Sequence, residues 1–237
     1  MIPLRDANPT HRTAIVTIGL IVACFVLFAY QLGLIASAGE GALERFFQAY
    51  GVVPVEAVAA WDDGTPISTP TVSLITSQFL HGGWLHLIGN MLYLWIFGNN
   101  IEDRLGRLAF IGFYLAGGIA AAAAQIAIDP TSDVPMIGAS GAIAAVLGAY
   151  LVFYPRARIT SLVFLGFFYQ LIDVPAILVL VFWFVLQLID GLASLGVASA
   201  GGVAFFAHIG GFVFGVAVAL LVRAGGRRGP GRRAVVG

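Results

Sequence analysis

Long apolar runs constrain this chain more than any other feature. A helix needs about 20 mostly apolar residues to cross the hydrocarbon core of a bilayer. Only 10% of the residues are charged, whereas a soluble domain is about 25% charged. We therefore predict an all-α, polytopic membrane protein with a bundle of six transmembrane helices. The predicted spans are Thr13–Ile35, Leu80–Gly98, Leu108–Ile128, a short one at Ser140–Tyr154, Pro175–Ile189 and Val203–Val222.

The basic residues indicate the orientation of the chain. All 12 of them are arginines, and only Arg45 falls on the outer side when the N-terminus is cytoplasmic. The other eleven fall on the inner side: Arg5, Arg12, Arg104, Arg107, Arg156, Arg158, Arg223, Arg227, Arg228, Arg232 and Arg233. The positive-inside rule then predicts an integral multi-pass protein of the cell (inner) membrane with both termini cytoplasmic.

Three regions follow from these spans. Residues 1–12 form a cytoplasmic N-terminal segment, and residues 13–222 form a single membrane domain. Residues 223–237 form a basic tail, predicted to be disordered near anionic lipid. The single cysteine, Cys24, excludes an intrachain disulfide and is interpreted as a small buried side chain.

The segments between the spans differ in character. Ser161–Ile172 is apolar but too short to cross the bilayer, so we interpret it as an interfacial or re-entrant part of a loop. The outer loop Ser37–Ser77 contains an amphipathic stretch, Leu43–Tyr50. Asp190–Gly202 is rich in Gly, Ala and Ser and is predicted to be mobile.

Polar residues inside the spans are few, and ionisable ones suggest function by default. The second span carries His86 and Asn90 in HGGWLHLIGN, the fourth begins with Ser140 in GASGA, and the sixth carries His208 in AHIGGFVFG. At a helical rise of about 1.5 Å per residue, Ser140, His208 and His86 all lie roughly 8–10 Å below the outer boundary. The three residues are therefore predicted to lie at one level of the membrane.

These residue types suit acyl transfer. A serine hydroxyl becomes a nucleophile when a histidine takes its proton, which pairs Ser140 with His208. Ser140 also begins a helix, where free backbone N–H groups can stabilise an oxyanion. His86 and Asn90 share one helix face and can donate to the same charge, whereas His81 lies off that face. No acidic residue lies within the spans, so a Ser–His dyad is expected.

Small and aromatic residues are assigned to packing. Gly211 and Gly215 form a G-x-x-x-G on the sixth span, and Gly138 and Gly141 flank Ser140, which favours close helix approach. Three of the four tryptophans, at positions 84, 95 and 183, are interpreted as interface anchors or packing residues.

Each signal taken singly has a simpler interpretation. His86 and His208 could ligate haem, because paired imidazoles are common axial ligands. Asn90 could bridge two helices. The conjunction of motifs is more specific than any of them alone.

That conjunction resembles the rhomboid family of intramembrane serine proteases over nearly the whole chain. The resemblance rests on HGGWLHLIGN (81–90), EDRLGR (102–107), GASGA (138–142) and AHIGGFVFG (207–215). It implies Ser140 as nucleophile, His208 as base, and His86, Asn90 and the Ser140 amide as oxyanion donors. This chain has Ala144 where some members carry an aromatic ring, and its first loop lacks a Trp-Arg pair found in some members.

The expected function is that of a serine endopeptidase, a hydrolase that cleaves transmembrane or juxtamembrane segments of other membrane proteins. Its expected partners are such substrates and the lipid bilayer, with no metal, cofactor or nucleic acid, and nothing in the residues specifies an oligomeric state. The alternatives are a non-catalytic rhomboid-like protein that binds membrane helices, and a haem-binding or ion-handling bundle.

Overall fold

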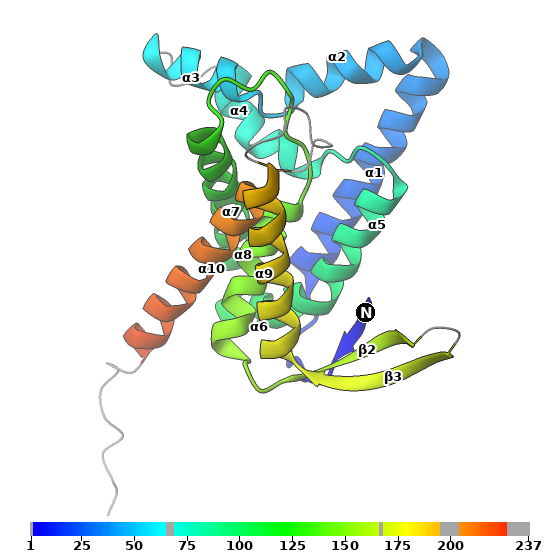
Figure 1. Cartoon of the computed structure of the whole chain (residues 1–237), viewed down its shortest axis with the longest axis vertical. Coiled ribbons are helices and arrows are strands. Elements are labelled where there is room, and N and C mark those ends of the chain that lie inside the picture. The colour runs from blue at the N-terminus through cyan, green and yellow to red at the C-terminus, as the bar shows by residue number, and fades with distance from the viewer. Residues whose placement is uncertain (1, 65–68, 166–167, 195–203, 227–237) are drawn as a thin grey trace, which may run out of the picture.

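The computed structural model describes residues 2–64, 69–165, 168–194 and 204–226. A bundle of helices forms the body of the molecule, and a small sheet lies at one end of it (Figure 1). The helices are α1 (Ile15–Ala38), α2 (Glu40–Tyr50), α3 (Pro54–Asp62), α4 (Thr69–Thr76), α5 (Trp84–Tyr93), α6 (Asn99–Leu105), α7 (Arg107–Ile128), α8 (Ser140–Phe153), α9 (Ala176–Ser194) and α10 (Phe205–Gly226). Two short segments, the 3-10 turn η1 (Ser77–Phe79) and the π-helical η2 (Leu94–Gly98), precede α5 and α6.

Each predicted span corresponds to helix in the structure, which confirms the polytopic all-α class. Four helices are individually long and apolar enough to cross a membrane, namely α1, α7, α9 and α10. The second predicted span is the continuous run of α5, η2 and α6, which begins at Trp84 rather than Leu80. The short fourth span is α8, with 14 residues. The amphipathic stretch in the outer loop is α2, and α3 and α4 are further helices of that loop which the sequence did not predict.

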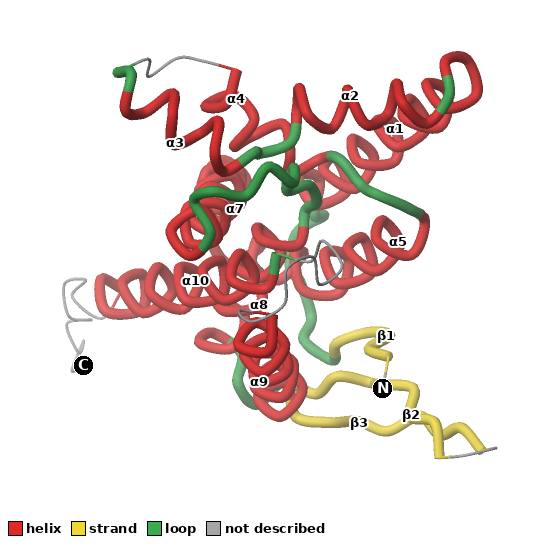
Figure 2. The backbone as a smooth tube through the Cα atoms, turned by 45° about the horizontal axis from the view of Figure 1, so that its top comes forward, coloured by secondary structure: helices red, strands yellow, loops and turns green. Residues whose placement is uncertain are grey.

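The short helix α8 lies at the centre of the bundle. It packs against α5, α7, α9 and α10, and Figure 2 shows it enclosed by them. Every residue from Gly141 to Tyr150 is buried. A helix that is apolar all round suits such a position, because no face of it needs to meet water. The serine at its start is therefore held by the core of the molecule.

Close contact between α8 and α10 depends on glycine. A Cβ at Gly211 would overlap the carbonyl oxygen of Gly141, and one at Gly215 would overlap that of Ala145. The absence of side chains at these two positions lets the backbones approach directly, as in other small-residue helix contacts. The contact brings the first turns of α8 and α10 together.

A buried carboxylate joins the start of α1 to α6. Glu102 accepts hydrogen bonds from the backbone N–H groups of Val16 at 3.0 Å and Thr17 at 2.8 Å, and from the Thr17 hydroxyl at 2.8 Å. A negative group at a helix N-terminus satisfies its free donors and complements its dipole. The first turn of α1 and the end of the second predicted span therefore lie at the same end of the bundle.

The segment Ser161–Ile172, interpreted as an interfacial or re-entrant part of a loop, contains strands that the sequence did not predict. Its described residues lie in two antiparallel strands, β2 (Arg158–Leu165) and β3 (Phe168–Pro175), and β1 (Ile2–Asp6) adds to the edge of β2. β-branched and aromatic residues are frequent in both strands, which favours extended backbone. Figure 1 shows this sheet leaving the lower end of the bundle sideways.

Two further sequence predictions fall partly or wholly outside the described residues. Helix α9 continues to Ser194, so the first residues of the segment predicted to be mobile are helical. The rest of that segment, residues 195–202, and residues 227–237 of the basic tail lie outside the described part of the chain.

Candidate active site

Ser140 is the first residue of α8, and the loop before it is fixed by backbone hydrogen bonds. Met136 and Val52 exchange two of them at 2.8 and 3.0 Å, and the N–H of Gly138 donates to the carbonyl of Ser77 at 2.9 Å. Gly138 has φ of 126°, a value that favours glycine. Ser140 thus enters its helix at a set angle, with the unpaired N–H groups of the first turn beside it.

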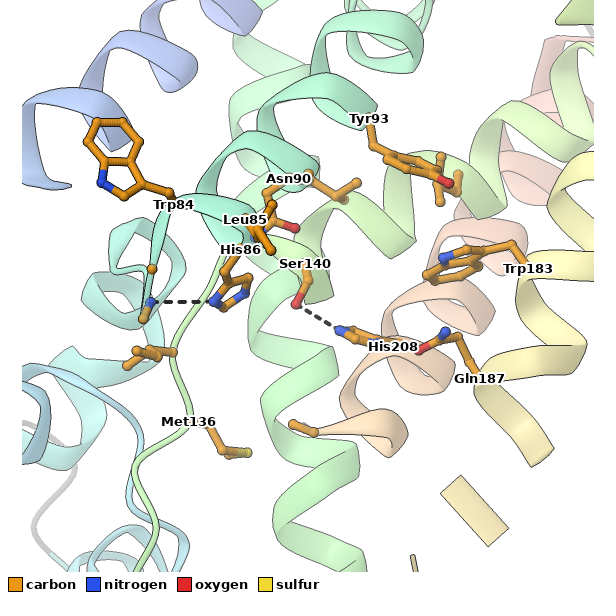
Figure 3. Close-up of a pocket in the computed structure, with 17 residues that line it drawn as sticks. Trp84, Leu85, His86, Asn90, Tyr93, Met136, Ser140, Trp183, Gln187 and His208 are labelled. Atoms are coloured by element: carbon orange, nitrogen blue, oxygen red, sulfur yellow. Dashed lines mark hydrogen bonds between the residues drawn. The ribbon is translucent and has the colours of Figure 1, made fainter. Parts of the chain in front are cut away.

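His208 approaches Ser140 from α10. Its Nε2 atom lies 2.8 Å from the Ser140 Oγ, which is hydrogen-bond distance. Its other ring nitrogen, Nδ1, lies 2.6 Å from the Oε1 of Gln187 on α9. Figure 3 shows the three side chains in sequence, from α8 through α10 to α9. Both nitrogens of the imidazole are therefore engaged.

His86 and Asn90 reach the same place from one face of α5. The N–H of Gly82 donates to His86 Nδ1 at 3.4 Å, which leaves Nε2 to carry the proton of the neutral ring. That Nε2 faces the Ser140 loop, because a Cβ built on Gly138 would come within 2.7 Å of it. The Nδ2 of Asn90 is buried and has no hydrogen-bond partner among the described residues. Each side chain therefore has an N–H available near Ser140.

A cavity of about 860 Å³ joins these groups. Its walls come from α5, α8, α9, α10 and the loop before α8, and they are mostly apolar. The polar side chains among its described lining residues are those of His86, Asn90, Tyr93, Ser140, Gln187 and His208, as Figure 3 shows. None of the described lining residues is Asp or Glu. The cavity can therefore hold an apolar segment of chain against a small cluster of hydrogen-bonding groups.

Among the predicted site residues, Ser140, His86, Asn90 and His208 all line this cavity. His81 does not; it is fully buried, with its ring centroid 5.2 Å from that of His86. The four glycines lie around the site, Gly138 and Gly141 beside Ser140, and Gly211 and Gly215 at the contact of α10 with α8. Among the described residues, no group of three or more His, Cys, Asp or Glu side chains gathers as a metal site would require.

Two features of the site were not predicted from the sequence. One is the role of Gln187, and the other is the contact between the rings of Trp183 and His208. The Trp183 ring centroid lies 6.0 Å from that of His208. It supplies an aromatic neighbour to the histidine from α9, where α8 offers only Ala144. Gln187 could have been found from the sequence as an amide within the apolar span Pro175–Ile189. Trp183 carried no such signal.

Comparison with known proteins agrees with these observations. The family model described as "Rhomboid domain" matches residues 69–225. The chain is 32% identical over 124 residues to "Rhomboid protein 1, mitochondrial" of Saccharomyces cerevisiae, covering 51% of this chain and 33% of that protein. It is 32% identical over 152 residues to "RHOMBOID-like protein 12, mitochondrial" of Arabidopsis thaliana, covering 56% and 43%.

A bacterial relative is similar over a shorter region. "Rhomboid protease GluP" of Bacillus subtilis is 42% identical over 78 residues, covering 33% of this chain and 15% of that protein. The chain thus spans less than half the length of each of these three relatives. Because the family model covers more than half of the chain, and the helices and motifs agree with it, this protein is an integral membrane protein that belongs to the rhomboid family.

Proposed function

We propose that this protein is an intramembrane serine endopeptidase that cleaves transmembrane or juxtamembrane segments of other membrane proteins. The observation that carries the proposal is the 2.8 Å contact between Ser140 Oγ and His208 Nε2 beside an open, mostly apolar cavity. Membership of a family with a relative named as a protease supports the same reaction class.

The reaction would begin with proton transfer from Ser140 to His208. As the Ser140 Oγ attacks the carbonyl carbon of the substrate peptide bond, its proton passes to Nε2 of the imidazole. The carbonyl oxygen gains negative charge, and the N–H groups of His86, Asn90 and the first turn of α8 would donate to it. Such donors stabilise a charge that develops only on the way to the tetrahedral intermediate.

The intermediate would then collapse to products in two stages. The C–N bond breaks, and His208 gives its proton to the leaving amine, so that Ser140 keeps the acyl group as an ester. A water molecule next attacks this ester while His208 takes the water's proton. Breakage of the ester bond returns that proton to the Ser140 oxygen and releases the acid. Each stage uses the same histidine as base and then as acid.

The cavity suits a substrate that is itself apolar. Trp84 and Leu85 stand at its α5 edge with large exposed surfaces, and Trp183 stands at its α9 edge. A transmembrane segment in lipid presents side chains that match such walls. We further propose that the protein lies in the cell (inner) membrane with both termini cytoplasmic, as its arginine distribution favours.

The alternative functions find less support in the geometry. A haem would need a free imidazole nitrogen, whereas both nitrogens of His208 have hydrogen-bond partners. A protein that only binds membrane helices has no need for a serine paired with a histidine. Proteolysis and covalent labelling of the serine distinguish these possibilities.

The test is the loss of activity in Ser140→Ala and His208→Ala. In liposomes with a transmembrane reporter substrate, we expect each variant to lose cleavage, and the double variant to lose no more, because the two residues act as a unit. A fluorophosphonate probe should label the wild type and not Ser140→Ala. Ser37→Ala, which changes an exposed serine at the end of α1, is the matched control. Cleavage by Ser140→Ala at the wild-type rate would refute the proposal.

A further inference from the structure

Gln187 is a polar side chain on an otherwise apolar stretch of α9, one turn after Trp183. It is partly buried and lines the active-site cavity. Its Oε1 lies 2.6 Å from Nδ1 of His208, on the side of the ring opposite Ser140. An amide in a membrane helix is costly unless it is paired, so this contact accounts for its position.

The chemistry of this contact determines which nitrogen of His208 carries the proton. An amide oxygen can only accept a hydrogen bond, so Nδ1 must be the donor. In a neutral imidazole the other nitrogen, Nε2, is then unprotonated. That is the nitrogen facing Ser140, and only in this tautomer can it accept the serine proton. The opposite tautomer would point an N–H at the serine oxygen and could not act as base.

Other side chains around the cavity do not provide this function. No Asp or Glu occurs among the described residues that line it, and the remaining ionisable side chains there belong to His86 and Tyr93. Trp183 contacts the His208 ring but offers no acceptor, because an indole N–H only donates. Gln187 is therefore the group in contact with Nδ1, in the place that a carboxylate occupies in a Ser–His–Asp triad.

We propose that Gln187 is a positioning residue that holds His208 in the tautomer and orientation needed for it to act as base. The expected Ser140–His208 dyad would then be extended by a third residue, Gln187, whose side chain is neutral. The inference rests on the proposed function, and it adds that α9 takes part in the chemistry through this hydrogen bond and does not merely form a wall.

Kinetic comparison of three variants tests this role. Gln187→Leu removes the acceptor at similar size, and we expect kcat to fall by about 10–100-fold with KM little changed. This effect is smaller than the roughly 10⁴-fold loss caused by a wrong tautomer in a triad with aspartate. Gln187→Glu keeps an oxygen acceptor and should retain most of the activity. Leu188→Ala, at the next position of α9 where the side chain is exposed, is the matched control and should match the wild type.

The Gln187→Glu variant also provides a pH signature. A carboxylate beside Nδ1 favours the protonated imidazole, which cannot act as base until it loses a proton. The acidic limb of the kcat/KM profile should therefore move to higher pH in Gln187→Glu and stay in place in Leu188→Ala. If the side chain at position 187 did not contact His208, this limb would stay unmoved in Gln187→Glu as well. Equal kcat in the wild type and Gln187→Leu would overturn the proposal.

A spectroscopic measurement separates this inference from the proposed function. Nitrogen-15 NMR of labelled histidine, with His208 assigned by its loss in His208→Ala, reports which nitrogen is protonated without any need for turnover. We expect a protonated Nδ1 in the wild type and Gln187→Glu, and a mixed or reversed tautomer in Gln187→Leu. A protonated Nε2 in the wild type would refute the role of Gln187. Absence of cleavage by the wild type would refute the protease function, and the NMR result would still decide the hydrogen bond.

Discussion

Asn90 carries a buried N–H donor that has no partner among the described residues. Leaving such a donor unpaired costs about 1–3 kcal/mol, so folded proteins rarely keep one without a reason. The reason proposed here is catalytic: Asn90 lines the same cavity as Ser140, and its Nδ2 is a donor that a developing oxyanion would satisfy. His86 offers a second N–H beside it.

This interpretation predicts a separation between activity and stability. Asn90→Ala and His86→Ala should each lower kcat by about 10²–10³-fold, the usual effect of losing one oxyanion donor. Asn90→Ala should leave Tm close to that of the wild type, because no protein hydrogen bond of Nδ2 is lost. Ile88→Ala, at an exposed position of α5, is the control. If Asn90 merely bridges helices, Tm will fall and the kcat of the surviving protein will be nearly normal.

At the scale of elements, the site depends on how closely α8 and α10 approach. The two helices touch through Gly211 and Gly215, each of which has backbone atoms of α8 where a side chain would lie. Backbone atoms cannot move aside as a flexible side chain can. Any added volume must therefore separate the helices that carry Ser140 and His208.

Gly215→Ala should consequently reduce both stability and activity. Overpacking of a well-packed contact typically costs about 1–3 kcal/mol. We expect a lower Tm and slower cleavage, measured on the same purified protein. Gly112→Ala on α7 is the matched control, since a Cβ there meets no atom within 4 Å. A Tm for Gly215→Ala equal to that of the control would mean that the close approach does not depend on this glycine.

At the scale of the whole molecule, the distribution of arginines and the packing of α1 against α6 favour the same orientation in the membrane. Glu102 holds the start of α1 against the end of α6, so these two points share one end of the bundle. Arg104 at the end of α6, Arg107 at the start of α7 and the arginines of the N-terminal segment are thereby brought to the same side. Under the positive-inside rule, this shared side favours the proposed orientation, in which it faces the cytoplasm.

The orientation predicts which side of the membrane each cysteine label can reach. In a Cys24→Ala background, Arg233→Cys should react with a membrane-impermeant thiol reagent only after the cytoplasmic side is exposed. Glu44→Cys, at an exposed position of α2, should react from the outside. Labelling of position 233 from the outside would overturn the orientation.

Hydropathy and motif spacing were enough to predict the membrane class, the approximate spans and the candidates Ser140, His208, His86 and Asn90. These are local properties, because each can be recognised within a short stretch of the chain. Examples are a run of apolar residues and a histidine four positions before an asparagine. The short length of the fourth span was also evident, and it proved to be the central helix α8.

Tertiary structure alone decided the rest. The 2.8 Å contact of Ser140 with His208 depends on the packing of α10 against α8, and the Gln187 contact depends on where α9 lies beside them. The pairing of β1 with β2 likewise joins the N-terminal segment to residues that lie far away in the chain. Such contacts join residues distant in sequence, and no local pattern specifies them. They arise only when the helices pack together and exclude other arrangements of the same spans.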